Sequence, residues 1–154
     1  MKPRHDWLTR PAGAGMIAAP KPKRGAADGD EEKKMAKILV VDDSPTQLTN
    51  LVRIVEGQGH QVMTANNGME GIERARADRP DLILMDVVMP ELNGFQATRK
   101  ITRDEQLGGI PVILVTTKDQ ETDKVWGQRQ GAVGYIVKPP QEAELVAEIN
   151  RVLG

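Results

Sequence analysis

The 154-residue sequence contains no cysteine, which excludes disulfide bonds, cysteine-ligated zinc sites and thiol nucleophiles. It also lacks any apolar run that approaches the roughly 20 residues needed to cross a bilayer. The formal net charge is only -1, which gives no indication of binding to nucleic acid or to an anionic membrane. This length supports one domain with a single hydrophobic core, and the absences together predict a soluble, cytoplasmic protein.

The first 34 residues differ in composition from the rest of the chain. They are rich in Pro, Gly, Ala and charged residues without apolar periodicity, so we expect a disordered N-terminal extension over 1–34. The stretch from Met16 to Ala19 is too short for the apolar part of a signal peptide. The basic cluster from Lys21 to Arg24 is either a solvated tail or a contact for an acidic partner. Met35 is a natural start for the second region, a domain over 35–154.

From position 37 onward, short apolar runs alternate with amphipathic stretches. The runs are continuous and rich in β-branched residues, which is typical of strands buried on both faces of a parallel sheet. Ser44 is a good N-cap for the first helix, and Gly131 lies just past the end of the fourth, over 122–130. The predicted strands are 37–41, 61–65, 82–85, 112–116 and 135–137, each followed by a helix. Five such units predict an α/β fold with helices on both faces of a five-stranded parallel sheet.

Polar residues stand at the carboxyl ends of four predicted strands. Asp42 and Asp43 follow the first strand, and Asp86 follows the third. Thr116 ends the fourth strand and Lys138 follows the fifth. Ligands bind open α/β sheets beyond these ends, so we expect the five side chains to meet at one rim. Each alone has an ordinary explanation, such as a helix cap or a solvated loop, but five coincidences at corresponding places favour a functional site.

Carboxylates that lie close together either hold protons or bind a cation, because like charges disfavour ionisation. Carboxylate oxygens without His or Cys nearby favour a hard ion such as Mg²⁺. Beside the metal, an Asp carboxylate can attack phosphorus and form an aspartyl phosphate. The metal, Lys138 and Thr116 would then each bind one phosphoryl oxygen.

Four segments resemble a known family, the CheY-like receiver domain of two-component response regulators, in order and from about 35 to 154. They are Val41-Asp42-Asp43-Ser44, Met85-Asp86-Val87-Val88-Met89-Pro90-Glu91-Leu92-Asn93-Gly94, Val115-Thr116-Thr117 and Tyr135-Ile136-Val137-Lys138-Pro139. The resemblance implies the doubly wound strand order 2-1-3-4-5. It also implies that Asp86 is the phosphoacceptor and, with Asp43, a direct Mg²⁺ ligand. Asp42 then acts on the metal largely through water, and the backbone carbonyl of Val88 completes the protein's share of the ligands.

The resemblance also implies which residues sense the phosphoryl group. Thr116 matches the hydroxyl that moves toward the phosphoryl group, and Tyr135 matches the aromatic side chain that rotates inward behind that hydroxyl. Lys138 matches the phosphate-binding lysine. The peptide bond before Pro139 is expected to be cis. Val88 matches a position beside the path of the attacking water, as Lys118 does. An apolar residue at position 88 predicts slow self-dephosphorylation, and simple apolar packing of Val88 is the alternative.

The implied phosphoryl donor is a sensor histidine kinase or a phosphotransfer domain. The implied target is a downstream protein, bound through the fourth helix, fifth strand and fifth helix. We expect no nucleic-acid binding and no membrane insertion. We also expect no enzyme activity beyond the domain's own phosphorylation and dephosphorylation. Within the family, the stretch 122–131 resembles the stand-alone regulators of type IV pilus twitching motility, a chemotaxis-like system. Trp126 in this stretch is either an interface anchor or a half-buried packing residue.

Other functions fit the sequence less well. A phosphorylation-independent adaptor could use the same surface, but such receivers typically lack an acidic residue or the lysine, and here all are present. An aspartyl-phosphate phosphatase would need a second carboxylate just past Asp86, where the sequence has Val87 and Val88. Nucleotide binding is disfavoured because neither a Walker loop nor a Gly-x-Gly-x-x-Gly turn follows the first strand.

Overall fold

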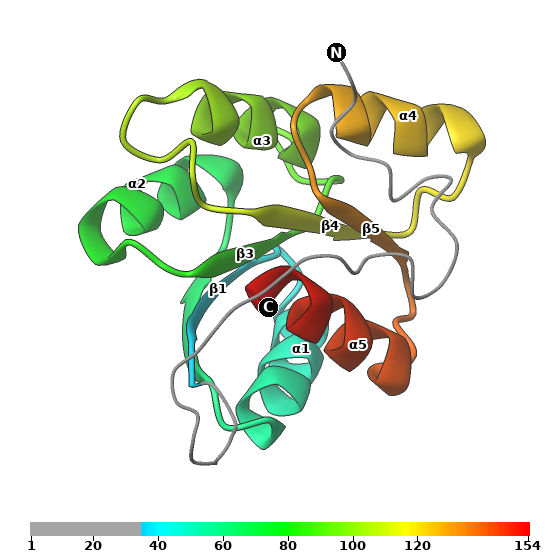
Figure 1. The fold of residues 1–154 in the computed structure, drawn as a ribbon. Helices are drawn as coiled ribbons and strands as arrows, with labels where there is room; N and C mark the ends of the chain where they lie inside the picture. The colour runs from blue at the N-terminus through cyan, green and yellow to red at the C-terminus, as the bar shows by residue number, and fades with distance from the viewer. Residues whose placement is uncertain (1–34) are drawn as a thin grey trace.

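A computed structural model describes residues 35–154, which form an α/β fold (Figure 1). The extension over 1–34, with its basic cluster, lies outside the described residues. The strands are β1 (Lys37–Val41), β2 (Gln61–Ala65), β3 (Leu82–Met85), β4 (Val112–Thr116) and β5 (Gly134–Val137). The helices are α1 (Pro45–Gly57), α2 (Gly68–Asp78), α3 (Gly94–Arg103), α4 (Glu121–Arg129) and α5 (Glu142–Leu153).

All neighbouring strands pair in parallel, in the order β2-β1-β3-β4-β5. Helices α1 and α5 cover one face of the sheet, and α2, α3 and α4 cover the other (Figure 1). The predicted fold class and strand order are therefore confirmed. In such an arrangement β1 and β3 lie side by side, and the loops that follow them meet at the carboxyl edge of the sheet.

The two faces of the sheet carry separate apolar cores rather than the single core expected from the chain length, because successive strand residues point to opposite sides. Leu39 and Val41 of β1 belong to the core under α2 and α3. Ile38 and Val40 belong to the core under α1 and α5. Their burial on both faces explains why the strands appear in the sequence as continuous apolar runs.

Local capping sets the helix boundaries. The Ser44 hydroxyl accepts a hydrogen bond from the backbone N–H of Gln47 at 3.3 Å, as expected of an N-cap. Helix α3 starts with a full capping box between Asn93 and Gln96. Helix α4 covers Glu121–Arg129, one residue earlier at each end than predicted. Among residues 35–154, no helix is long and apolar enough to cross a membrane.

Candidate functional site

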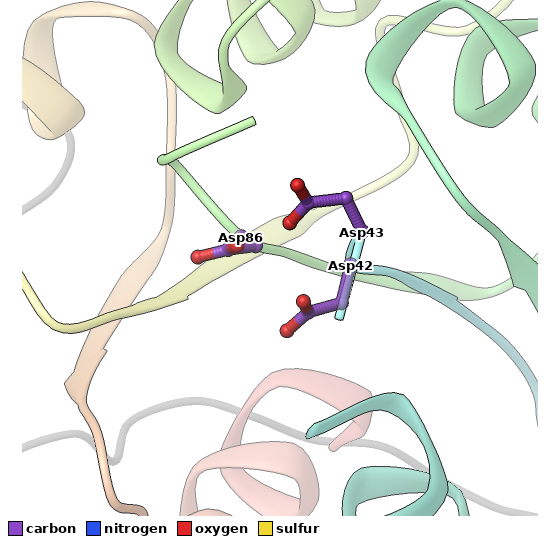
Figure 2. Close-up of side chains that lie close together, drawn as sticks. All are labelled: Asp42, Asp43 and Asp86. Carbon is purple, nitrogen blue, oxygen red and sulfur yellow. The ribbon is translucent and has the colours of Figure 1, made fainter. Parts of the chain in front are cut away.

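The three predicted aspartates lie together at the carboxyl edge of the sheet. Asp42 and Asp43 follow β1, Asp86 follows β3, and Figure 2 shows their carboxylates grouped beyond the strand ends. One oxygen from each of the three carboxylates lies within 4.8 Å of the others. The pairing of β1 with β3 produces this grouping, since Val41 and Met85, the last residues of the two strands, are directly opposite each other.

The three carboxylates differ in their exposure to solvent. Asp42 is fully buried and Asp86 is 7% exposed, whereas Asp43 is exposed. The carboxylates of Asp42 and Asp86 are therefore held away from water. In such a buried environment, a charge without a partner is costly. Asp43 supplies an open side from which an ion can reach the cluster.

Lys138 is the cation that faces this cluster. Its Nζ donates to Asp42 Oδ2 at 2.6 Å and lies 3.4 Å from Asp86 Oδ1, with only 5% of the side chain exposed. The other Asp42 oxygen accepts a hydrogen bond from the backbone N–H of Ser44 at 2.9 Å. Lys138 itself is positioned by β4, because its backbone N–H donates to the carbonyl of Thr116 at 2.8 Å. The Lys138–Pro139 peptide bond is cis.

The environment of Asp86 disfavours its ionised form. The pKa of Asp86 is raised from 3.8 to about 6, mainly by burial and next by the negative charge of Asp42. Lys138 lowers the pKa, as does the backbone N–H of Val87, which donates to Asp86 Oδ1 at 2.9 Å. Asp86 is thus still mostly ionised at neutral pH, but it is a stronger base than an ordinary aspartate.

The loop between β3 and α3 is folded tightly against Asp86. Gly94 donates its backbone N–H to the carbonyl of Val87 at 2.9 Å, and a Cβ at position 94 would overlap the carbonyl oxygen of Asp86. Glu91 has a φ of 67°, in the left-handed region that few non-glycine residues adopt.

Val88 is 58% exposed, so its side chain does not pack into the core, in contrast to the packing alternative for this residue.

The backbone of Lys118 connects Thr116 to Tyr135. The buried Thr116 Oγ1 accepts from the backbone N–H of Lys118 at 3.3 Å, and the Tyr135 hydroxyl donates to the carbonyl of Lys118 at 2.8 Å. Burial, with the charges of Asp123 and Asp119, raises the pKa of Tyr135 well above its usual value, so the phenol keeps the proton it donates. The Lys118 Nζ lies 3.6 Å from Asp123 Oδ1, on α4.

Sequence reasoning missed three parts of this arrangement. The backbone of Lys118 joins Thr116 to Tyr135, but a backbone role leaves no signal in the residue type. The closeness of Gly94 to Asp86 follows only from the folded loop. The third part is Gly127 of α4, where a Cβ would lie 3.3 Å from the Tyr135 ring.

Comparisons with known proteins agree with this geometry. The model of the response regulator receiver domain matches residues 38–150, which is more than half of the chain. Protein PilH of Pseudomonas aeruginosa is 59% identical over 119 residues, a region that covers 77% of this chain and 98% of PilH. The fold of residues 35–154 is also similar to that of the chemotaxis protein CheY4 of Vibrio cholerae, with a TM-score of 0.73 and 33% identity over 77% of this chain and 99% of CheY4.

A further similar structure contains a metal. The receiver domain of the sensor histidine kinase PA1611 from Pseudomonas aeruginosa has a TM-score of 0.73 and 30% identity, over 79% of this chain and 99% of that one. That structure has a magnesium ion coordinated in its active-site cleft. The group of Asp42, Asp43 and Asp86 is the acidic cluster typical of such sites. The chain therefore belongs to the response regulator receiver domains, which are signalling domains of two-component systems and not classical enzymes.

Proposed function

We propose that this domain receives a phosphoryl group on Asp86 from a phosphohistidine of a sensor kinase, with Mg²⁺ bound to the acidic cluster. The observation that supports this most is the placement of Asp86 within 4.8 Å of two other carboxylates and 3.4 Å from Lys138. A nucleophile, a cation and a set of oxygen ligands are the parts that phosphoryl transfer requires.

The donor set fits a hard divalent cation. All three side chains offer carboxylate oxygens, which Mg²⁺ prefers, and Mg²⁺ usually keeps water as its other ligands. Both oxygens of Asp42 are already hydrogen-bonded, to Lys138 and Ser44, which favours Asp43 and Asp86 as direct ligands, with Asp42 acting through water. The backbone carbonyl of Val88 would add a further protein ligand. When bound, the ion supplies positive charge that offsets the charge on the transferred group.

In the proposed reaction, a carboxylate oxygen of Asp86 forms a bond to phosphorus while the bond from phosphorus to the histidine nitrogen breaks. The imidazole leaves with that electron pair, so no oxidant or further reactant is needed. Lys138 would hold a second phosphoryl oxygen, and the 3.4 Å distance from its Nζ to Asp86 Oδ1 supports this role. Val87 and Val88 offer no acid or base next to Asp86, which fits an acceptor better than a phosphatase.

The response to phosphorylation is proposed to pass through Thr116. Its hydroxyl would exchange the Lys118 N–H for a phosphoryl oxygen, and Tyr135 would then turn inward as its partner at Lys118 shifts. This changes the surface of α4, β5 and α5, through which a downstream protein would be bound. The similarity to PilH and the resemblance of 122–131 to twitching-motility regulators support a cytoplasmic role in controlling type IV pili.

The experiment that tests the proposed function is intact mass spectrometry after incubation with acetyl phosphate. Wild type should gain one phosphoryl group, and the gain should depend on Mg²⁺ and disappear in Asp86→Asn. Asp81→Asn is the matched control, because Asp81 lies at the opposite edge of the sheet, where its carboxylate accepts from the backbone N–H of Lys37. This control should be phosphorylated like wild type.

The competing function is a phosphorylation-independent adaptor that uses the same α4–β5–α5 surface. It would be favoured if folded wild type gained no phosphoryl group under rapid quenching while still binding its partner. The buried Lys138–Asp42 pair argues against it, since an adaptor has no use for buried charges at this edge.

A further inference from the structure

The loop between β3 and α3 carries two of the proposed metal ligands, and its two ends are joined. Asp86 stands at its start, followed by Val88, whose carbonyl is the proposed backbone ligand. The N–H of Gly94 donates to the carbonyl of Val87 at 2.9 Å, which closes the loop. Between these ends, 88–92 form no hydrogen bond with any other residue of the described part of the chain. The position of the middle of the loop therefore depends on packing.

The first turn of α2 supplies a close part of that packing, because α2 lies beside α3 on the same face of the sheet (Figure 1). A Cβ at Gly68, the first residue of α2, would lie 2.8 Å from the carbonyl oxygen of Leu92 and 3.2 Å from its Cδ2. A Cβ essentially never lies within 3.0 Å of another atom. Because the nearest atom belongs to the backbone, a side chain at this position would displace the loop itself.

The local conformation does not require a glycine at position 68. The φ of Gly68 is not positive, so its backbone is open to other residues, and glycine is a poor helix former. The close approach of Leu92 is the contact that needs the missing side chain. Gly68 therefore allows the loop to lie directly against the backbone of α2.

The same turn of α2 also packs closely against β1, which leads to the other part of the acidic cluster. A Cβ at Gly71 would lie 2.9 Å from Cγ2 of Val41, the last residue of β1. Val41 directly precedes two aspartates of the cluster. One turn of α2 therefore contacts both the strand that leads to these two carboxylates and the loop that carries the remaining proposed ligands.

We propose that Gly68 is a positioning residue for the metal site, because it sets how closely the β3–α3 loop approaches the end of β1. This role rests on the function proposed above, since it concerns the Mg²⁺ ligands assigned there. Mg²⁺ tolerates little deviation from octahedral geometry, so the loop and the end of β1 must be held at a defined separation. A methyl group at position 68 would displace Leu92, and with it the backbone of Val88. Gly68 acts through Leu92 and contacts no ligand itself.

The test is the dissociation constant of Mg²⁺ for the full chain, measured by calorimetric titration at a temperature where each variant is folded. Gly68→Ala should weaken Mg²⁺ binding by roughly tenfold or more, as is typical when a residue that supports a metal ligand is changed. The control is Gly127→Ala, where a Cβ would lie 2.7 Å from Leu114 Cδ1, on α4. This variant overpacks the interior to a similar degree but should bind Mg²⁺ as wild type does. In metal-free protein, the amide chemical shifts of Val88 and Leu92 should change in Gly68→Ala only.

A second pair of variants changes the other side of the contact and decides the matter if Gly68→Ala does not fold. Leu92 packs against the core under α2 and α3, so Leu92→Ala should loosen the loop and also weaken Mg²⁺ binding by roughly tenfold. Leu92→Met, which conserves the volume, should bind Mg²⁺ as wild type does.

The outcomes separate this inference from the proposed function. If wild type binds Mg²⁺ and Gly68→Ala binds it equally well, or if Gly127→Ala loses affinity to the same extent, Gly68 has no positioning role and the proposed function stands. If Gly68→Ala does not fold, unchanged Mg²⁺ binding in Leu92→Ala overturns the inference. If wild type binds no Mg²⁺, the proposed metal site fails, and the role of Gly68 fails with it.

Discussion

The interior of the domain and the carboxyl edge of its sheet contribute to stability with opposite signs. In the interior, side chains such as Ile38, Leu84 and Leu145 are at most 1% exposed, and each buried apolar surface favours folding. At the edge, Asp42 and Asp86 are buried as carboxylates, and Lys138 compensates their charge only in part. The raised pKa of Asp86 shows that folding there disfavours the ionised form.

This difference indicates how one small domain can be both stable and responsive. The apolar cores under α1 and α5 and under α2 and α3 stabilise the sheet. The carboxyl edge can therefore keep charges that destabilise the metal-free domain. A bound cation then relieves part of that cost, which links binding to conformation. Substitutions in the interior should therefore lower stability, while neutral or better-paired groups at the edge should raise it.

The largest effect is expected in the interior. Leu145 of α5 is fully buried, so Leu145→Ala should lower the free energy of unfolding by about 2–5 kcal/mol, measured by urea denaturation. Leu153 belongs to the same helix but is only partly buried, so Leu153→Ala should cost about 1 kcal/mol. A similar loss in both variants would show that α5 does not depend on its buried stripe.

The second effect is the stabilisation of the charged edge by a metal. At a hundredfold excess over its dissociation constant, Mg²⁺ should raise the free energy of unfolding by about 2.7 kcal/mol, seen as a higher melting temperature. Asp43→Ala removes the exposed carboxylate that we propose as a direct ligand, so it should abolish most of this rise while the metal-free protein stays folded. An equal rise in the variant would place the ion elsewhere.

A smaller effect is expected where α4 contacts the interior. Gly127→Ala places a methyl group 2.7 Å from Leu114 Cδ1, and overpacking of this kind costs about 1–3 kcal/mol, offset by up to about 1 kcal/mol of helix propensity. Gly57→Ala is the matched control, because a Cβ at this last position of α1 meets nothing within 4 Å. Urea denaturation should show a net loss for Gly127→Ala only. No loss would mean that α4 shifts freely to make room.

The sequence predicted the fold well because the strands are buried on both faces. Continuous apolar runs such as 37–41 and 112–116 are short and rich in β-branched residues, which is typical of strands buried on both faces. The confirmed strand order came from the family resemblance. The position of the acidic cluster was also predictable, since parallel strands bring Asp42, Asp43 and Asp86 to one edge whatever the loops do.

The details of the site could not be predicted, because they depend on distances. No sequence pattern shows that Lys138 lies 2.6 Å from Asp42 and 3.4 Å from Asp86. The start of α5 at Glu142 was also hidden, because its first turn is exposed and leaves no apolar stripe. Contacts made by the backbone, such as those of Lys118, are independent of residue type and are visible only in the fold.

The smallest effect concerns the pH dependence of the edge, and its sign is opposite to that of an interior substitution. The folded-state pKa of Asp86 is about 6 against 3.8 for an ordinary aspartate. Protonation of Asp86 therefore stabilises the fold, fully below pH 3.8, and this contribution is lost as the pH rises through about 6. Asp86→Asn, which removes the charge, should accordingly raise the stability of the metal-free protein at neutral pH, by about 1–2 kcal/mol once solvent screening is allowed for.

The measurement is the difference in free energy of unfolding between Asp86→Asn and wild type, taken from pH 7.5 down to pH 4.5 without metal. Because the substitution leaves Lys138 paired with Asp42 at 2.6 Å, it creates no unpaired buried cation. The difference should shrink as the pH falls, since wild type gains the proton that the variant does not need. A difference that stays constant over this range would mean that Asp86 ionises normally, and the edge would then contribute to stability no differently from the surface.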